Sequence, residues 1–81
     1  MAHLPINIAA EWDPEASVWV ATSEDIDGLA IEAETLEKLI ERLPGVLEDL
    51  VEGNHPELLV GRRDIPFAVH ASRIGNIALT A

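Results

Sequence analysis

The period of the apolar pattern changes near residue 35, and this change limits the chain to a sheet followed by a helix. Residues 4–12 alternate strictly between apolar and other side chains, which is the pattern of a half-buried strand. From residue 36 to residue 51 the apolar side chains instead recur every three or four positions, as on one face of a helix. They are Leu36, Leu39, Ile40, Leu43, Leu47, Leu50 and Val51. The sequence therefore predicts strands first and one amphipathic helix after them.

Three strands are expected before the helix. Residues 13–16 follow the first strand and contain Pro14, which suits the second position of a type I turn leading into a strand over residues 17–23. Asp27-Gly28 then favours a tight turn into a third strand over residues 29–33. The register of the first hairpin is not determined by this pattern, and a slip of one residue exchanges the two faces. The face occupied by Trp19 therefore stays open.

The helix is expected to begin after Thr35, a good N-cap residue, and to end at Gly53-Asn54. Pro44 interrupts it and removes one backbone hydrogen bond, at a cost of about 3 kcal/mol. Since the apolar stripe keeps its phase across Pro44, we expect one kinked helix and not two separate ones.

After the helix, residues 54–64 are expected to form a connection and residues 65–71 a fourth strand, with Pro66 at its start or at a sheet edge. Residues 76–81 either turn back at Gly75 as a fifth strand or extend. The predicted fold class is α+β: a single domain over residues 1–81 in the order βββαβ, with a mixed or antiparallel sheet and the kinked helix on one face. Small residues, namely Ala9, Ala21 and Ala68, are expected on the other sheet face as a candidate dimer or partner surface.

The charge of the chain is strongly negative and unevenly distributed. The net charge is −10, from 15 acidic and 5 basic residues. Residues 1–57 carry 14 acids against Lys38 and Arg42, or −12, whereas residues 58–81 carry Arg62, Arg63 and Arg73 against Asp64, or +2. Such a field repels nucleic acid and attracts a basic protein. The three arginines are interpreted as surface residues or as partners of the acidic helix.

Several classes of protein are excluded or disfavoured by composition. Without cysteine there is no disulfide, no thiolate zinc site and no cysteine nucleophile. No apolar run is long enough to span a membrane, and the amino terminus lacks the basic segment and following apolar stretch of an export signal, so we expect a cytoplasmic protein without membrane contact.

No residue pattern in the chain indicates an enzyme or a cofactor. His3, His55 and His70 are scattered singly and are interpreted as structural or surface residues. Glu24, Asp25 and Asp27 cluster in the second turn, and Glu32 and Glu34 share one side of the third strand. Such carboxylates can hold Mg²⁺ or Ca²⁺, as in a metal-dependent nuclease remnant, but turn acids more commonly cap their own backbone amides. We therefore expect neither metal nor catalysis.

Residues 12–43 resemble the HicB-like antitoxin superfamily, in particular its short single-domain branch catalogued as a domain of unknown function. The resemblance is carried by the Trp19-Val20 pair, by the acidic turn around Asp25, Ile26, Gly28 and Leu29, and by the helix entry Glu34-Thr35-Leu36-Glu37. It departs from the family at Asp27, where a proline is common.

The resemblance implies a truncated ribonuclease H-like fold and a non-enzymatic module. Members of this family bind and neutralise a small basic, HicA-like, mRNA-cleaving toxin. We expect a homodimer or higher homo-oligomer that makes no direct contact with nucleic acid, since residues 1–81 leave no room for the DNA-binding domain of full antitoxins. The expected partner contacts are Trp19, if it faces outward, with Glu24, Asp25, Asp27, Glu32 and Glu34. The alternative is a stand-alone homo-oligomer without a toxin.

Overall fold

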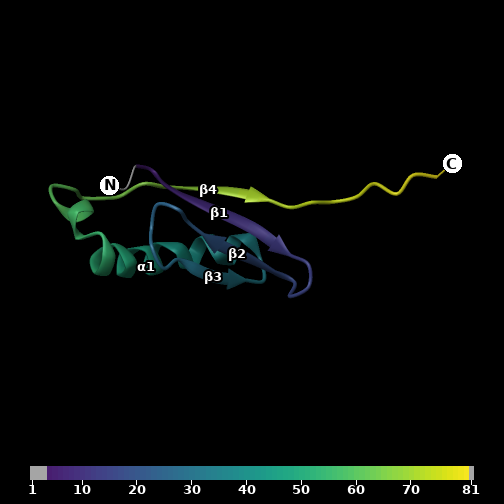
Figure 1. Cartoon of the computed structure of the whole chain (residues 1–81), viewed down its shortest axis with the longest axis horizontal. Helices are drawn as coiled ribbons and strands as arrows, with labels where there is room; N and C mark the ends of the chain where they lie inside the picture. The colour runs from purple at the N-terminus through teal and green to yellow at the C-terminus, as the bar shows by residue number, and fades with distance from the viewer. Residues whose placement is uncertain (1–3, 81) are drawn as a thin grey trace.

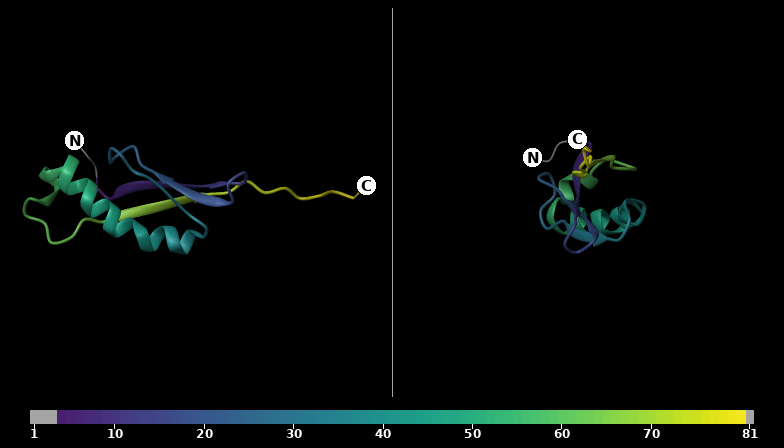
Figure 2. Two further views of the ribbon diagram at one scale, coloured as in Figure 1. Left: turned by 90° about the horizontal axis from the view of Figure 1, so that it is seen from below. Right: turned by 90° about the vertical axis from the view of Figure 1, so that its right-hand side faces the viewer.

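A four-stranded sheet with one long helix on one face makes up the body of the molecule (Figures 1 and 2). The computed structural model describes residues 4–80. Its elements are β1 (Ile6–Asp13), β2 (Val18–Thr22), β3 (Ala30–Ala33), α1 (Leu36–Asn54), the 3-10 helix η1 (Pro56–Leu59) and β4 (Phe67–Ser72). The sheet order is β3-β2-β1-β4, with β4 parallel to β1 and the other pairs antiparallel. The α+β class and the mixed sheet predicted from the sequence are confirmed.

The register of the first hairpin decides the face of Trp19. Ala10 lies opposite Ala21 and Trp12 opposite Trp19, so both β2 residues share the helix-facing side of the sheet with the buried Ala10. Trp19 is half-buried against the core, and its ring meets that of Trp12 edge-on at 5.7 Å. The expectation that Ala21 lies on the uncovered face is wrong, because this register buries it completely. Ala9 and Ala68 do lie on that face.

The helix α1 covers the inner sheet face with a single apolar stripe. Thr35 caps it by accepting a hydrogen bond from the Lys38 amide, and Leu39, Leu43, Leu47 and Val51 are buried. It runs continuously through Pro44 and ends at Asn54 as predicted. The C-cap is His55, whose amide donates to the Val51 carbonyl, whereas Gly53 remains inside the helix. The main strand contacts of α1 are with β2 and β3.

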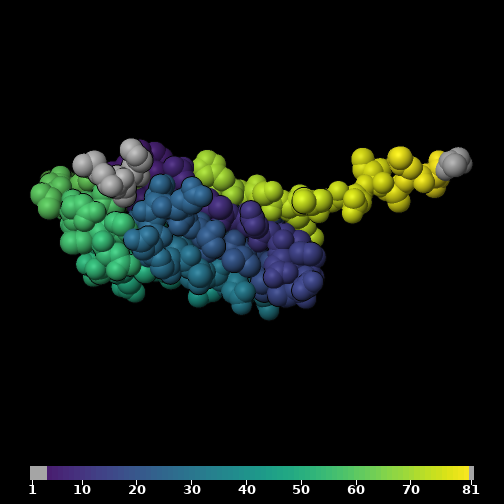
Figure 3. All heavy atoms as spheres, in the orientation of Figure 1, coloured from purple at the N-terminus to yellow at the C-terminus, as the bar shows by residue number. Residues whose placement is uncertain are grey.

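The chain after α1 departs from expectation in its connection, and its tail follows one of the two courses left open by the sequence. The connection contains η1, which buries Leu58 in the core. Residues 73–80 contain no strand; they leave the body as an extended arm (Figure 3) and lengthen the molecule to 61 Å, against 20 and 18 Å in the other directions. Of the two alternatives for the tail, the structure therefore shows extension within the described residues.

Candidate protein-binding surface

The sheet face opposite α1 is uncovered (Figure 2). By strand register, this face carries a row of two carboxylates around a valine. Glu11 of β1 lies opposite Val20 of β2, and Val20 lies opposite Glu32 of β3. Opposed residues project to the same face, and neighbouring strands are about 4.8 Å apart, which places the two glutamates roughly 10 Å apart across Val20. Both glutamates are exposed, whereas Val20 is half-buried. We call these three residues the acidic row.

Several small side chains lie beside the acidic row on the same sheet face. The next cross-strand row is formed by Ala30, Thr22, Ala9 and His70, and Ala68 lies opposite Asn7 one row further on. His70 contacts the Asn7 side-chain oxygen through its Nε2 atom at 3.0 Å. A small apolar area bordered by carboxylates suits a basic protein partner, since it offers contact area and opposite charge together.

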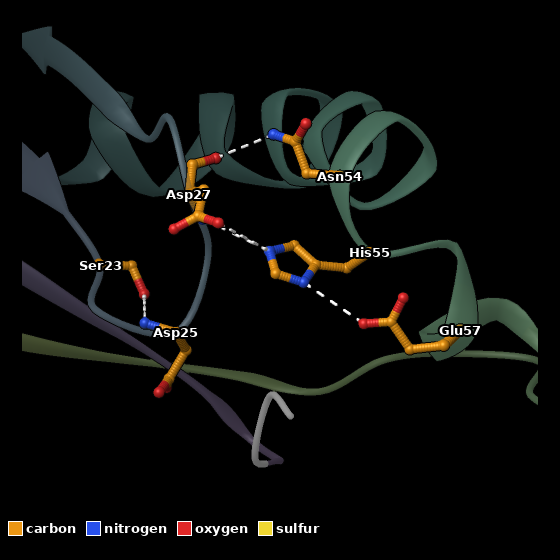
Figure 4. A network of polar contacts seen from close by, with 6 residues as sticks. All are labelled: Ser23, Asp25, Asp27, Asn54, His55 and Glu57. Carbon is orange, nitrogen blue, oxygen red and sulfur yellow. Dashed lines mark hydrogen bonds and ion pairs between the residues drawn. The ribbon is translucent and has the colours of Figure 1, made fainter.

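The turn between β2 and β3 is fixed to β1 by Ser23 and Asp25. The Ser23 hydroxyl donates to the Asn7 carbonyl at 2.7 Å and accepts from the Asp25 amide at 3.0 Å (Figure 4). The Asn7 amide in turn donates to Oδ2 of Asp25 at 2.8 Å. The carboxylate of Asp25 therefore provides a hydrogen-bond acceptor for β1 beyond the end of β2. Asp25 thus has a structural role in this turn.

The same turn is fixed to the C-terminal end of α1 through Asp27 and Gly28. The Asn54 side-chain amide donates to the Asp27 carbonyl at 3.1 Å, and Nε2 of His55 lies 3.5 Å from the Asp27 amide and 4.0 Å from its carboxylate (Figure 4). Nδ1 of His55 lies 3.4 Å from the Glu57 carboxylate. Gly28 has a φ of 87°, and a Cβ there would lie 3.4 Å from Leu50. Glycine thus permits both the turn and its close approach to the helix.

The six residues expected to contact a partner are not gathered on one surface. Trp19 faces the helix, and Glu24, Asp25 and Asp27 lie in the turn beside the C-terminal end of α1. Glu32 belongs to the acidic row, while Glu34 follows β3, precedes the N-cap and lies 3.9 Å from Lys38. Glu11 and Val20 were not among the residues expected from the sequence to contact a partner. The alternation of β1 already directs Glu11 away from the core, but its alignment with Glu32 depends on the registers of two strand pairs.

The arginines have separate environments. The Arg73 guanidinium lies over the Trp12 ring, 4.2 Å from its centroid, a favourable cation–π distance. Arg62 and Arg63 line a groove that also contains Glu48 and Glu52 of α1. The interpretation of these residues as surface arginines near the acidic helix agrees with this placement.

Among residues 4–80, no three His, Asp or Glu side chains lie close enough together to hold a metal ion. No helix in this range has the length and apolarity needed to cross a bilayer. His3 lies outside the described residues.

The mixed sheet, the single covering helix and the exposed acidic face define a small α+β domain of the βββαβ type. The chain belongs to the family described as Domain of unknown function (DUF1902), whose model matches residues 5–78. It is similar to the crystal structure of the hypothetical protein TTHA1013 from the extremely thermophilic bacterium Thermus thermophilus. That similarity has a TM-score of 0.65 at 35% identity and covers 91% of this chain and 97% of the other. Comparison with curated proteins finds no match.

Proposed function

We propose that this chain is a non-enzymatic, HicB-like binding module of the antitoxin type, which neutralises a small basic, mRNA-cleaving protein by covering it. The observation that carries this proposal is the acidic row on an uncovered sheet face. Glu11 and Glu32 flank Val20 in register, so two cationic side chains of a partner can pair with the carboxylates while apolar atoms contact the valine. The resemblance of residues 12–43 to HicB-like antitoxins supports the same class of partner.

The charge of the whole chain supports the proposal. All acidic residues except Asp13 and Asp25 are exposed, and the net charge is −10. A basic partner is therefore attracted over a distance of about one Debye length, roughly 8 Å at physiological ionic strength. Association with such a partner should be fast at low salt and slower at high salt.

The test compares three immobilised baits in native lysate: wild type, Glu11→Lys/Glu32→Lys, and Glu41→Lys/Asp49→Lys. Both variants reverse two exposed carboxylates and change the net charge equally, but the second pair lies on α1. We expect a small basic protein to be retained by wild type and by the α1 variant, lost from the acidic-row variant, and released by high salt. The retained protein should cleave mRNA, and wild-type chain should inhibit that cleavage.

Equal retention on all three baits, or equal loss from both variants, would remove the acidic row as the contact. If the purified chain self-associates and retains no basic protein, the alternative is favoured: a stand-alone homo-oligomer. The exposed apolar arm of residues 73–80 is the observation that supports this alternative.

A further inference from the structure

The extended arm of residues 73–80 exposes three large aliphatic side chains outside the body of the protein. Ile74, Ile77 and Leu79 are 92%, 86% and 90% exposed. The base of the arm is held in place by Arg73 on the Trp12 ring. Burying such side chains releases free energy of about 25 cal/mol per Å² of apolar surface. Burial of these aliphatic side chains against another protein surface is therefore favoured over their exposure to water.

The sheet offers one long unpaired edge for such a segment, and it lies on the strand from which the arm extends. β4 is the outermost strand on one side of the sheet and has six residues. The opposite edge is the shorter β3, where the Arg42 guanidinium donates to the Glu32 carbonyl and so occupies part of the edge. Unpaired edges readily accept another strand.

A groove with apolar and charged lining residues lies beside β4 on the helix-facing side. Since α1 packs mainly over β2 and β3, the start of β4 is left partly uncovered, and Phe67 and Val69 are only half-buried. The groove has a volume of about 510 Å³ and is the one that Arg62 and Arg63 line. Its apolar lining is Ile6, Pro44, Leu47, Val51, Leu59, Ile65 and Phe67, and its rim carries Glu48, Glu52 and Asp64 beside the two arginines.

The charge distribution favours a second copy of this chain at the β4 edge. Residues 65–80 contain no Asp or Glu, although the whole chain contains 15 acidic residues. Two molecules with a net charge of −10 repel each other over most of their surfaces, and this acid-free stretch is where they can approach with least repulsion. Pairing of two copies at the β3 edge would instead gather Glu32 and Glu34 of both molecules along one seam.

We propose that the arm of each molecule pairs antiparallel with β4 of a second copy, so that two arms are exchanged across a two-fold axis. In an extended strand, Ile77 and Leu79 project to the same side as Phe67 and Val69, because all four are separated by even numbers of residues. This is the side of the groove. Eight extended residues span about 26 Å, enough to cover the roughly 20 Å of β4 and reach the groove at its start.

The exchange has a defined consequence for the molecule. Antiparallel pairing of two identical edges places the axis perpendicular to the sheet, so both helices lie on one side of a continuous sheet. Both acidic rows then share the opposite side. The inference does not depend on the proposed function, because neither the arm nor the groove belongs to the acidic row.

The test uses full-length variants and sedimentation equilibrium. Ile77→Asn and Ile74→Asn make the same chemical change at two exposed arm positions, but only Ile77 projects toward the groove. We expect a wild-type dimer. Ile77→Asn should raise the dimer dissociation constant by roughly tenfold or more, since each dimer loses two buried side chains, and Ile74→Asn should change it by less than about threefold. Circular dichroism should show the wild-type fold in both, since these side chains lie outside the core.

Three results would overturn the inference: a wild-type chain that stays monomeric at hundreds of micromolar, a dimer unaffected by Ile77→Asn, or equal weakening by both substitutions. A monomer would indicate an arm that turns back on its own sheet, and an unaffected dimer would indicate another interface. The proposed function is tested by a different experiment, the retention of a basic protein. A chain that forms the arm-exchanged dimer but retains no basic protein would support this inference and contradict the proposed function.

Discussion

Asp25 and Asp27 lie two residues apart in one acidic turn, yet their carboxylates have different surroundings. The Asp25 carboxylate accepts from the Asn7 amide at 2.8 Å, whereas the Asp27 carboxylate is 89% exposed and lies 4.0 Å from His55. A charge change at Asp25 therefore disturbs the packing of the turn on β1, and a change at Asp27 alters mainly the surface. Binding experiments on this turn should use Asp27 and Glu24.

Replacing Asp25 with alanine is expected to lower the free energy of unfolding by about 1 kcal/mol, because the Asn7 amide exchanges its hydrogen bond to the half-buried Asp25 carboxylate for one to water. Glu24→Ala is the matched control, since this neighbouring carboxylate is exposed, and its effect should stay within about 0.5 kcal/mol. Urea denaturation followed by tryptophan fluorescence measures both. Similar values for the two variants would contradict the structural role of Asp25.

At the scale of the elements, α1 shows how tertiary packing overrides local preference. Pro44 lies inside the helix and leaves the carbonyl of Ile40, four residues earlier, without its helical donor. The helix nevertheless continues, because Leu39, Leu43, Leu47 and Val51 form a stripe that is buried only if both halves share one axis. The apolar period predicted this continuity, whereas η1 was missed because four residues are too few to show a period.

Pro44→Ala is expected to raise the free energy of unfolding by about 1–3 kcal/mol, because it restores the missing hydrogen bond and relieves the clash of the ring with the preceding turn. Pro56→Ala is the control: Pro56 is the first residue of η1, where no helical donor is required, and its effect should be small. Urea denaturation again provides the measurement. An unchanged or lower value for Pro44→Ala would mean that the proline contributes packing at the groove that outweighs its cost.

At the scale of the whole molecule, the dominant electrostatic term is repulsion among exposed carboxylates. Within residues 4–80, one ion pair joins a Lys or Arg to an acidic side chain. It is the pair of Lys38 and Glu34, which lie 3.9 Å apart on the surface. Such a pair contributes little, about 0–1 kcal/mol. Self-repulsion at a net charge of −10 therefore outweighs attraction in the folded state.

Added salt should accordingly stabilise the protein. Raising NaCl from about 10 to 150 mM shortens the Debye length from about 30 to 8 Å, and we expect the free energy of unfolding to rise by about 1 kcal/mol. Urea denaturation measures this at a protein concentration where sedimentation equilibrium shows the same association state at both salt concentrations, because a change in dimerisation would otherwise add to the free energy of unfolding. A decrease with salt would show that attractive pairs dominate.

The sequence by itself determined the element order, the α+β class, the continuity of α1 and the negative charge, because periodicity, capping residues and composition are local properties of the chain. Only the tertiary structure decided the side of Trp19, the burial of Ala21 and the alignment of Glu11 with Glu32 across Val20. These depend on strand register, which a shift of one residue would reverse. The environment of Arg73 likewise required the parallel pairing of β4 with β1, between residues more than fifty positions apart in the chain.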